Sequence, residues 1–311
     1  MKNFDIAIIG GGPAGYNAAA NASANGLQVV LFEHTALGGV CLNEGCIPTK
    51  TLLHSANLLD EMRESAAYGI HVEGAISANY AEIVARKDKI VKTLTGGVSY
   101  KLKGAGVTVI SKTARLTGEE GDRILVATDD ETYAVSYVLL ATGSETATPP
   151  IPGLSEVGYW TSREALSATT LPKDITIIGG GVIGVEMAEA LVSLGTKVTI
   201  IEMADYIIPA LDKEVSQTLR SELEKRGITI LTGAAIEKIE DRSGKLAAVL
   251  KDGRVIEGEK ALLSIGRVPD LEGVGEIEFE IERGRIKVDK YMETSVKGIY
   301  APGDVNGLKM L

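Results

Sequence analysis

Residues Asp5–Glu33 read DIAIIGGGPAGYNAAANASANGLQVVLFE, and residues Asp174–Glu202 read DITIIGGGVIGVEMAEALVSLGTKVTIIE. The two segments have the same length, and 12 of their 29 positions are identical. Each contains an apolar run, a glycine-rich turn, a helix-compatible stretch, a glycine, a second apolar run and a terminal glutamate. This order predicts a β–α–β unit that occurs twice in the chain.

Three glycines in each copy have the spacing G-x-G-x-x-G of a dinucleotide-binding turn. The first permits the tight turn, the second lets a pyrophosphate approach the backbone, and the third lets the helix pack on the strand. The phosphates would lie at the helix N-terminus, and the terminal acid would accept hydrogen bonds from a ribose hydroxyl. One such turn is a weak signal, whereas two in the same context are a strong one. The sets are Gly10, Gly12, Gly15 and Glu33, and Gly179, Gly181, Gly184 and Glu202.

The acid of the second copy favours NAD over NADP. A carboxylate at Glu202 would repel a 2′-phosphate, and the next residues, Met203, Ala204 and Asp205, include no arginine that could bind one.

Three segments are expected from the positions of the two copies. Pro149, Pro150, Pro152 and Gly153 cannot continue a helix or a central strand and mark a boundary. We expect a first dinucleotide-binding domain over 1–148, a second over 149–269, and a return segment over 270–311. A long helix is expected over Tyr80–Lys103 and a strand over Arg285–Val288. The fold class is α/β with two Rossmann-like domains.

Composition narrows the class of protein. The net charge of -10 argues against a sequence-independent nucleic-acid binder, which needs lysine and arginine to neutralise phosphates. No apolar run approaches the roughly 18 residues of a membrane helix. The N-terminus has no basic region and cleavage site of a secretory signal. We expect a cytoplasmic protein that binds neither nucleic acid nor a membrane.

The two cysteines, Cys41 and Cys46, lie in the run GGVCLNEGCIPTK that ends at Lys50. A crosslink over so short a loop would stabilise the fold by only about 2 kcal/mol. No further Cys or His stands nearby at ligand spacing, so we expect no metal site. Two buried free thiols remain an alternative. The favoured interpretation is a dithiol–disulfide switch, because the paired glycines, the nearby helix start and Lys50 would favour a thiolate.

The run Gly39–Lys50 resembles the redox-disulfide motif of the pyridine nucleotide–disulfide oxidoreductases, most closely in its dihydrolipoamide dehydrogenase form. Further matches are Ala141–Ser144, Gly181–Glu186, Ile265–Pro269 and Ile299–Val305, so the resemblance covers residues 1–311. It implies a three-layer fold of the glutathione reductase type. It also implies that FAD binds the first copy and NAD the second.

The resemblance also implies site residues. Cys46 would lie beside the flavin, Cys41 would meet the substrate, and Lys50 and Glu186 would pair near the flavin. Asp304 would bind the ribityl chain, and Ala114 would meet adenine through its backbone. The expected FAD contacts are Gly10, Gly12, Pro13, Ala14, Gly15, Glu33, Gly39, Lys50, Ala114, Thr142, Gly143, Ser144 and Asp304. The expected NAD contacts are Gly179, Gly181, Val182, Ile183, Gly184, Glu202, Ile236, Gly266 and Arg267.

The expected reaction passes electrons between dihydrolipoamide, Cys41–Cys46, FAD and NAD. The expected partner is the lipoyl-bearing protein of a 2-oxoacid dehydrogenase or glycine cleavage complex. Members of the family are homodimers and continue past the position of Asp304 into an interface domain that supplies a His–Glu pair. This sequence ends before such a domain, so full turnover by the chain alone is in question. The alternatives are a glutathione- or mercury-type reductase and a non-catalytic flavoprotein fragment.

Overall fold

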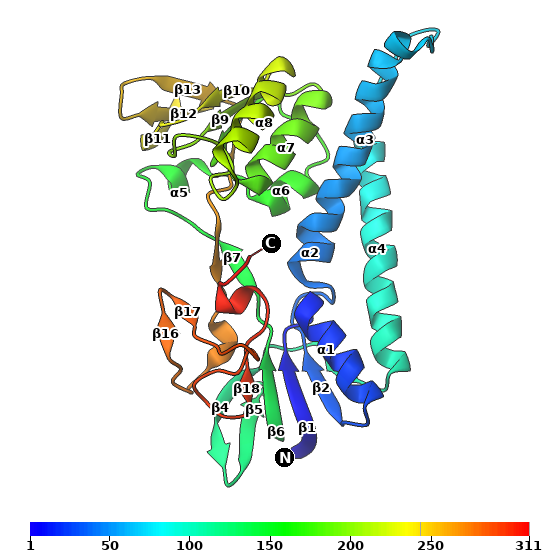
Figure 1. Cartoon of the computed structure of the whole chain (residues 1–311), viewed down its shortest axis with the longest axis vertical. Helices are drawn as coiled ribbons and strands as arrows, with labels where there is room; N and C mark the ends of the chain where they lie inside the picture. The colour runs from blue at the N-terminus through cyan, green and yellow to red at the C-terminus, as the bar shows by residue number, and fades with distance from the viewer. Residues whose placement is uncertain (243, 311) are drawn as a thin grey trace. The chain divides into compact units, whose positions relative to one another are not determined.

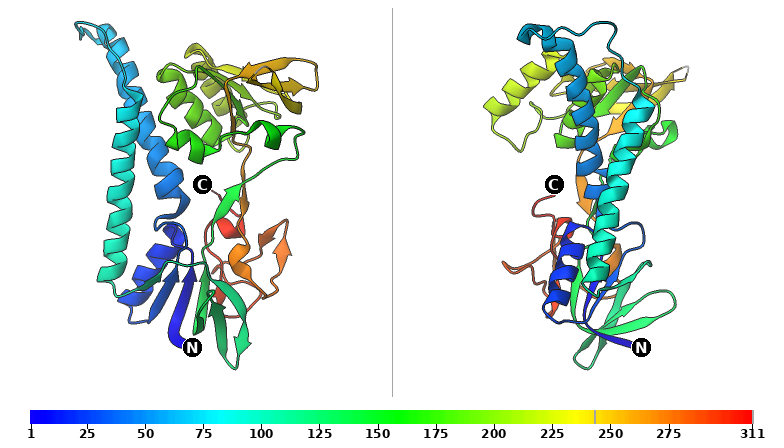
Figure 2. Two further views of the ribbon diagram at one scale, coloured as in Figure 1. Left: turned by 180° about the vertical axis from the view of Figure 1, so that it is seen from behind. Right: turned by 90° about the vertical axis from the view of Figure 1, so that its right-hand side faces the viewer.

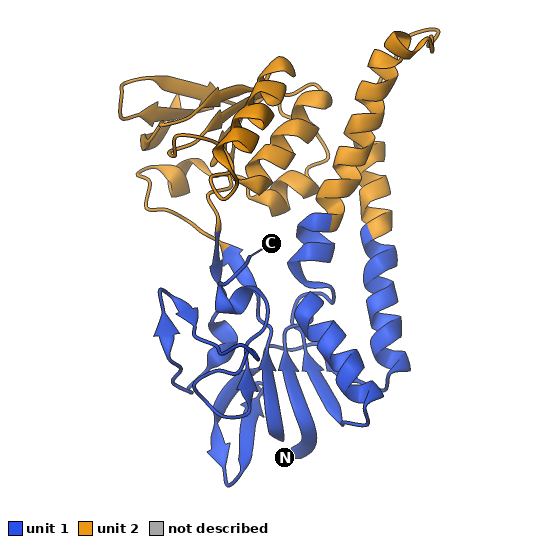
Figure 3. Ribbon diagram, viewed as in Figure 1, with its two compact units in different colours: residues 1–46, 91–145, 267–311 blue, residues 47–90, 146–266 orange. Residues whose placement is uncertain are grey.

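The computed structural model describes residues 1–242 and 244–310, which form two compact units (Figures 1 and 3). Unit 1 contains residues 1–46, 91–145 and those from 267 onward, and unit 2 contains residues 47–90 and 146–266. The first glycine-rich turn therefore belongs to unit 1 and the second to unit 2.

The units differ from the expected domains mainly in one segment. The expected boundaries at 148 and 269 lie near the unit boundaries at 145 and 266. Residues 47–90, however, belong to unit 2, whereas the sequence assigned them to the first domain. The physical reason is packing, because Leu52 lies in the hydrophobic core of unit 2 and the partly buried Ile83 packs against that core.

Unit 1 is built on a sheet with the strand order β3-β2-β1-β6-β5-β4, and β18 also pairs with β6. Strands β1, β2, β3, β6 and β18 are parallel, and β4 and β5 add an antiparallel hairpin. The bounds are β1 Lys2–Ile9, β2 Val29–Phe32, β3 Thr108–Ile110, β4 Arg115–Glu120, β5 Arg123–Ala127, β6 Thr132–Leu140 and β18 Ile299–Tyr300.

Both faces of the β1–β2 region are buried, as expected for a parallel sheet. One face packs Ile8 and Leu31 against Ala19 of α1 (Pro13–Ala24) and Leu102 of α4 (Tyr80–Gly104). The other face contributes to a second core with the β4–β5 hairpin and the C-terminal segment. That segment contains η2 (Glu272–Val274), β16 (Ile281–Glu282), β17 (Arg285–Ile286) and η3 (Asp304–Asn306).

Unit 2 contains the second Rossmann-like sheet, with the parallel strand order β10-β9-β8-β14. A separate antiparallel sheet has the order β11-β12-β13. The strands are β8 Asp174–Ile178, β9 Lys197–Ile201, β10 Thr229–Leu231, β11 Ile236–Arg242, β12 Lys245–Leu250, β13 Val255–Gly258 and β14 Lys260–Leu263. The helices that accompany them are α5 Leu154–Val157, α6 Ser162–Ser167, α7 Val182–Ser193 and α8 Lys213–Lys225.

A helical hairpin occupies residues 47–90 of unit 2. Helix α3 (Cys46–Glu64) continues into η1 (Ser65–Tyr68), and the first part of α4 returns beside α3 in both views of Figure 2. Arg86 of α4 donates to the backbone oxygen of Thr51 on α3 at 3.2 Å. The observed α4 confirms the helix expected over Tyr80–Lys103.

The chain passes between the units four times, and the last two crossings lie at neighbouring strands. β7 (Ser144–Thr146) and β15 (Arg267–Pro269) form a two-stranded sheet. The strand expected over Arg285–Val288 is present as the shorter β17. None of the described helices has the length and apolar character needed to cross a membrane.

Candidate functional site

The first glycine-rich turn has the three properties that a dinucleotide requires. Gly10 has a φ of +106°, and a Cβ there would lie 2.2 Å from the oxygen of Ala141. A Cβ on Gly15 would lie 1.9 Å from the oxygen of Gly10. At Gly12 the nearest atom to a Cβ is the Cα of Gly39, at 3.8 Å. The first and third glycines are therefore required by packing, whereas the second leaves room beside the N-terminus of α1.

The second turn repeats this geometry. Gly179 has a φ of +105°, and its Cβ would lie 2.5 Å from the oxygen of Ser264. A Cβ on Gly184 would lie 2.2 Å from the oxygen of Gly179, and one on Gly181 would meet nothing closer than 3.8 Å. The N-cap residues of α1 and α7 are Gly12 and Gly181, which have no side chain to accept hydrogen bonds from the first turn of the helix. Both helix N-termini thus offer backbone N–H groups to an anion.

The two terminal acids bind their turns in the same way. Glu33 accepts hydrogen bonds from the N–H of Gly11 at 2.8 Å and of Thr35 at 2.7 Å. Glu202 accepts them from Gly180 at 2.6 Å and Ala204 at 2.7 Å. Each carboxylate therefore lies at the end of its second strand, next to its glycine-rich turn.

The cysteine-bearing loop is attached directly to the first turn. The N–H of Gly38 donates to the oxygen of Gly11 at 2.8 Å. A Cβ on Gly39 would lie only 2.6 Å from the Cα of Gly12. Gly38 and Gly39 have φ values of +102° and +60°, which glycine adopts without strain. This close approach explains the paired glycines before the first cysteine.

Helix α2 (Gly39–Glu44) carries Cys41, and Cys46 begins α3. Asn43 holds the loop by donating to the oxygens of Leu37 at 3.1 Å and Gly39 at 2.9 Å. The two thiols are not bonded to each other in this structure. Both cysteines are partly exposed, which argues against the alternative of two buried structural thiols.

A second cluster of unit 1 contains several of the remaining residues expected to contact FAD. Ser144 donates to a carboxylate oxygen of Asp304 at 2.6 Å, and Thr142 donates to the backbone oxygen of Asp270 at 2.6 Å. A Cβ on Gly303 would lie 3.4 Å from the Cβ of Ala14 at the start of α1. Asp304 thus lies one residue from the point where the C-terminal segment meets the first turn.

Lys50 and Glu186 form an ion pair within unit 2. The Nζ of Lys50 on α3 lies 2.6 and 2.9 Å from the two carboxylate oxygens of Glu186 on α7. The side chain of Lys50 is 57% exposed and that of Glu186 is 26% exposed. The side chains expected to pair do so, and their position relative to a flavin stays a prediction.

Arg267 was expected with the NAD contacts and lies in unit 1. Its Nε donates to the hydroxyl of Ser144 at 2.7 Å, and its Nη2 donates to the Ser144 backbone oxygen. Gly266, which precedes it, ends unit 2 with a φ of +120°. The assignment of Arg267 to the nicotinamide nucleotide also stays a prediction.

The other expected contact residues lie at the starts of helices and strands. Pro13 and Val182 are the first residues of α1 and α7, and Ile183 comes directly after Val182. Ile236 begins β11. Ala114 is buried just before β4.

Sequence reasoning missed the residues that support the two turns. Gly11 and Gly180 stand at the variable position of the fingerprint, yet a Cβ on either would lie 2.9 Å from an apolar side chain, that of Leu37 or Ile207. Ser264, whose hydroxyl donates to Gly179, was also missed. The available signal was the middle glycine of each run of three, which the G-x-G-x-x-G pattern does not require.

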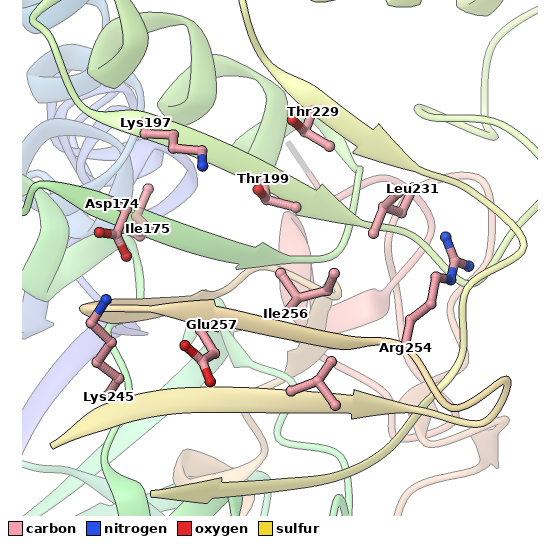
Figure 4. A pocket seen from close by; sticks show the side chains of 11 residues that line it. Asp174, Ile175, Lys197, Thr199, Thr229, Leu231, Lys245, Arg254, Ile256 and Glu257 are labelled. Atoms are coloured by element: carbon pink, nitrogen blue, oxygen red, sulfur yellow. The ribbon is translucent and has the colours of Figure 1, made fainter. Parts of the chain in front are cut away.

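A pocket in unit 2 lies away from the glycine-rich turn, between the parallel strands and the antiparallel sheet (Figure 4). Its volume is about 450 Å³, and Asp174, Lys197, Lys245, Arg254 and Glu257 contribute charges of both signs. It is not part of the candidate site. Among the described residues, no group of three or more His, Cys, Asp and Glu side chains is arranged to hold a metal ion.

Comparison with known proteins shows the family. The model of the pyridine nucleotide-disulphide oxidoreductases matches residues 4–311. This chain belongs to that family. It is 42% identical to a dihydrolipoyl dehydrogenase of Acholeplasma laidlawii, over 100% of this chain and 92% of the relative. It is 38% identical to the dihydrolipoyl dehydrogenase of Bacillus subtilis, over 97% of this chain and 67% of the relative.

Solved structures agree with this assignment. LpdA from Mycobacterium tuberculosis superposes with a TM-score of 0.89 at 29% identity, over 100% of this chain and 69% of that one. The Cu(II) complex of RclA from Escherichia coli, an HOCl-induced flavoprotein disulfide reductase, gives 0.85 at 28% identity, over 99% of this chain and 67% of that one. The expected α/β fold of the glutathione reductase type is confirmed.

The family makes the chain an FAD-dependent disulfide oxidoreductase that uses a pyridine nucleotide. The residues present fit both groups. Each turn leaves its second glycine open, presents the N-terminus of a twelve-residue helix and places a carboxylate at the end of the next strand. Two such sites accommodate two dinucleotides.

Proposed function

We propose that this chain oxidises dihydrolipoyl groups and passes their electrons through Cys41 and Cys46 to FAD and on to NAD. The observation that carries the proposal is the attachment of the cysteine loop to the first glycine-rich turn, through Gly38 and Gly39. A dithiol that exchanges electrons with a cofactor must lie next to that cofactor. A loop fixed on the dinucleotide turn meets this requirement.

Two electrons pass through each stage of the reaction. A dihydrolipoyl dithiol reduces the Cys41–Cys46 disulfide, which leaves a lipoyl disulfide and two cysteine thiols. The first glycine-rich turn and Glu33 would hold FAD, which would take up these two electrons as the Cys41–Cys46 disulfide re-forms and a proton is released, and would supply a hydride to NAD. By its resemblance, Cys41 exchanges with the substrate and Cys46 lies nearest the flavin. The partial exposure of both cysteines supports this exchange, because an attacking thiolate must reach a sulfur.

The substrate class is supported by the relatives. Several proteins that match nearly all of this chain at 34–42% identity are dihydrolipoyl dehydrogenases. We propose a lipoyl-bearing protein of a 2-oxoacid dehydrogenase or glycine cleavage complex as the partner, and NAD as the acceptor. The carboxylate of Glu202 supports NAD, because it would repel a 2′-phosphate.

The test compares substrates in the flavin-loaded protein. Dihydrolipoamide should reduce the bound flavin and then NAD, whereas glutathione should be at least ~100-fold slower, an efficiency difference of about 2.7 kcal/mol. Equal rates with glutathione would contradict the proposed substrate. Efficient reduction of Hg(II) or Cu(II) by NADH, without lipoamide activity, would favour a metal-ion reductase instead.

The cysteine pair is tested by counting thiols under denaturing conditions. The oxidised protein should contain no free thiol, and the reduced protein should contain two, because the chain has two cysteines. Cys41→Ser and Cys46→Ser should each contain one thiol in both states and should not oxidise dihydrolipoamide. Two free thiols in the air-oxidised, active protein would show that the pair is not the redox group.

A further inference from the structure

The repeat extends beyond the two 29-residue copies into the loop after each acid. In unit 1, Leu37 fills the space above Gly11, and the N–H of Gly38 donates to the Gly11 oxygen at 2.8 Å. In unit 2, Ile207 fills the space above Gly180, and the N–H of Ile208 donates to the Gly180 oxygen at 2.8 Å. The pairs Leu37–Gly38 and Ile207–Ile208 therefore have the same place in the two copies.

The two pairs differ in the backbone strain that they carry. The donor in each pair has a positive φ, +102° at Gly38 and +44° at Ile208. Glycine adopts such angles freely, whereas a β-branched residue there is a strong outlier. Pro209 comes directly after Ile208 and restricts its backbone further. Isoleucine is therefore held in an unfavourable conformation at a position where the first copy has glycine.

The surroundings of Ile208 impose this conformation. Ile207 is fully buried, and Ile208 is 8% exposed. The hydroxyl of Ser216, itself 1% exposed, donates to the oxygen of Ile207 at 2.6 Å. The N–H of Leu211 donates to the oxygen of Ile208 at 3.0 Å. Buried side chains and hydrogen bonds on both sides thus fix the loop, as strained residues at functional sites require.

The hydrogen bond from Ile208 fixes one peptide plane of the glycine-rich turn. Its acceptor is the carbonyl of Gly180, which belongs to the peptide that joins Gly180 to Gly181. A trans peptide is planar, so the N–H of Gly181 points away from that carbonyl and from Ile208. Holding the carbonyl therefore sets the direction of the N–H on the open side of the turn.

We propose that Ile208 is a positioning residue for the nicotinamide nucleotide. Its left-handed backbone directs its N–H to Gly180 and so preorganises the turn that receives the pyrophosphate. The inference rests on the proposed function of the second turn as the NAD site. The decisive property is the backbone conformation and the N–H of residue 208, while the isoleucine side chain contributes to packing.

Three substitutions separate these properties. Ile208→Pro removes the N–H and forbids a positive φ, whereas Ile208→Gly and Ile208→Asn keep the N–H and tolerate the left-handed region. The dissociation constant for NADH and the limiting rate of flavin reduction are measured by stopped flow in the FAD-loaded protein. FAD content and thermal unfolding are the controls, because unit 1 contains the unchanged first turn.

Ile208→Pro should raise the dissociation constant at least ~10-fold, while the limiting rate at saturating NADH changes by less than about twofold. The Gly and Asn variants should stay within about threefold of the original affinity. Unchanged affinity in Ile208→Pro would overturn the inference. If Ile208→Pro fails to fold, a tenfold loss in Ile208→Gly would overturn it, since the side chain would then be decisive. If the unsubstituted protein binds no NADH, the proposed function fails instead.

Discussion

Glu33 and Glu202 each hold a glycine-rich turn through two hydrogen bonds to their carboxylates. Each carboxylate accepts the N–H of the middle glycine of its turn and the N–H two residues after itself. Each therefore anchors the turn to the end of the next strand. We propose that Glu202 also favours NAD over NADP, because its negative charge would repel a 2′-phosphate on the ribose.

Glu202→Gln should weaken the preference for NADH over NADPH by about tenfold, which corresponds to about 1.4 kcal/mol. The amide keeps one acceptor for the loop but removes the charge that opposes a phosphate. Stopped-flow titration with both nucleotides measures the ratio of dissociation constants. The matched control is Glu33→Gln in the first copy, which should lower FAD retention and leave the nicotinamide preference unchanged. A larger shift of preference in the control would contradict the assignment of the two turns.

Single residues could be predicted where sequence and local geometry agree. The first and third glycines of the two fingerprints were predictable, because the positive φ of Gly10 and Gly179 and the close contacts at Gly15 and Gly184 arise from the turn itself. Ile208 was not predictable, because its φ of +44° contradicts the local preference of isoleucine. Its conformation depends on a hydrogen bond to Gly180, 28 residues away in the sequence.

Strand β6 illustrates how one element combines packing with a titratable group. It lies centrally in the sheet of unit 1, paired with β1 and β5. Tyr133 on β6 is 1% exposed, packs edge-on against Phe32 at a centroid distance of 5.0 Å, and donates to Glu131 at 2.6 Å. Desolvation, strengthened by the neighbouring Glu131 carboxylate, raises the pKa of Tyr133 to about 12.

The raised pKa predicts a loss of stability at alkaline pH. A tyrosine in the unfolded chain ionises near pH 10, whereas folded Tyr133 stays protonated until about pH 12. Its contribution is therefore present below pH 10 and falls as the pH rises toward 12. Denaturant unfolding at pH 9 and pH 11.5 measures it. Tyr133→Phe should lose less stability over this interval than the unsubstituted protein, whereas Tyr137→Phe, 47% exposed on the same strand, should not differ.

The ion pair between α3 and α7 predicts an effect on the reaction rather than on stability. Lys50 is 57% exposed, so its pair with Glu186 should contribute at most about 1 kcal/mol. Glu186→Gln should therefore shift thermal unfolding slightly, while flavin reduction by NADH slows at least ~10-fold if the pair acts at the flavin. Glu189, one turn further along α7, pairs with Arg226 and provides the control Glu189→Gln, which should reduce flavin normally. Equal rates of flavin reduction in the two variants would show that the Lys50–Glu186 pair only connects α3 and α7.

Elements were more predictable than their assembly. The helix predicted over Tyr80–Lys103 agrees with α4 to within one residue. The two strands and the helix predicted for each copy are also present. The sequence could not assign residues 47–90 to unit 2, because apolar positions such as Leu52 and Ile83 indicate a buried face without naming its partner. The pairing of β18 with β6 could not be predicted from the sequence either, because it joins strands more than 150 residues apart.

At the scale of the whole molecule, the chain uses one architecture twice and makes the two copies unequal through their C-terminal loops. The loop after Glu33 carries two glycines and then Cys41, so the first turn is joined to the proposed redox pair. The loop after Glu202 carries Ile207 and Ile208 and no cysteine, so the second turn is supported but not joined to one. The two copies therefore differ in their proposed functions because of these loops, since the turns themselves are nearly identical.

This difference predicts that the same substitution weakens the binding of FAD in the first copy and of NADH in the second. A Cβ at Gly12 or Gly181 would meet no protein atom closer than 3.8 Å, so Gly12→Ala and Gly181→Ala should both fold, with thermal unfolding near that of the parent. The added methyl group would instead occupy the space through which a pyrophosphate approaches the backbone. Gly12→Ala should therefore lose FAD at least ~10-fold more readily, seen as lower flavin absorbance per protein after gel filtration. Gly181→Ala should stay yellow and should accept electrons from dihydrolipoamide, yet it should need at least ~10-fold more NADH for flavin reduction. If Gly181→Ala instead lost FAD while Gly12→Ala kept it, the cofactors would have been assigned to the wrong copies.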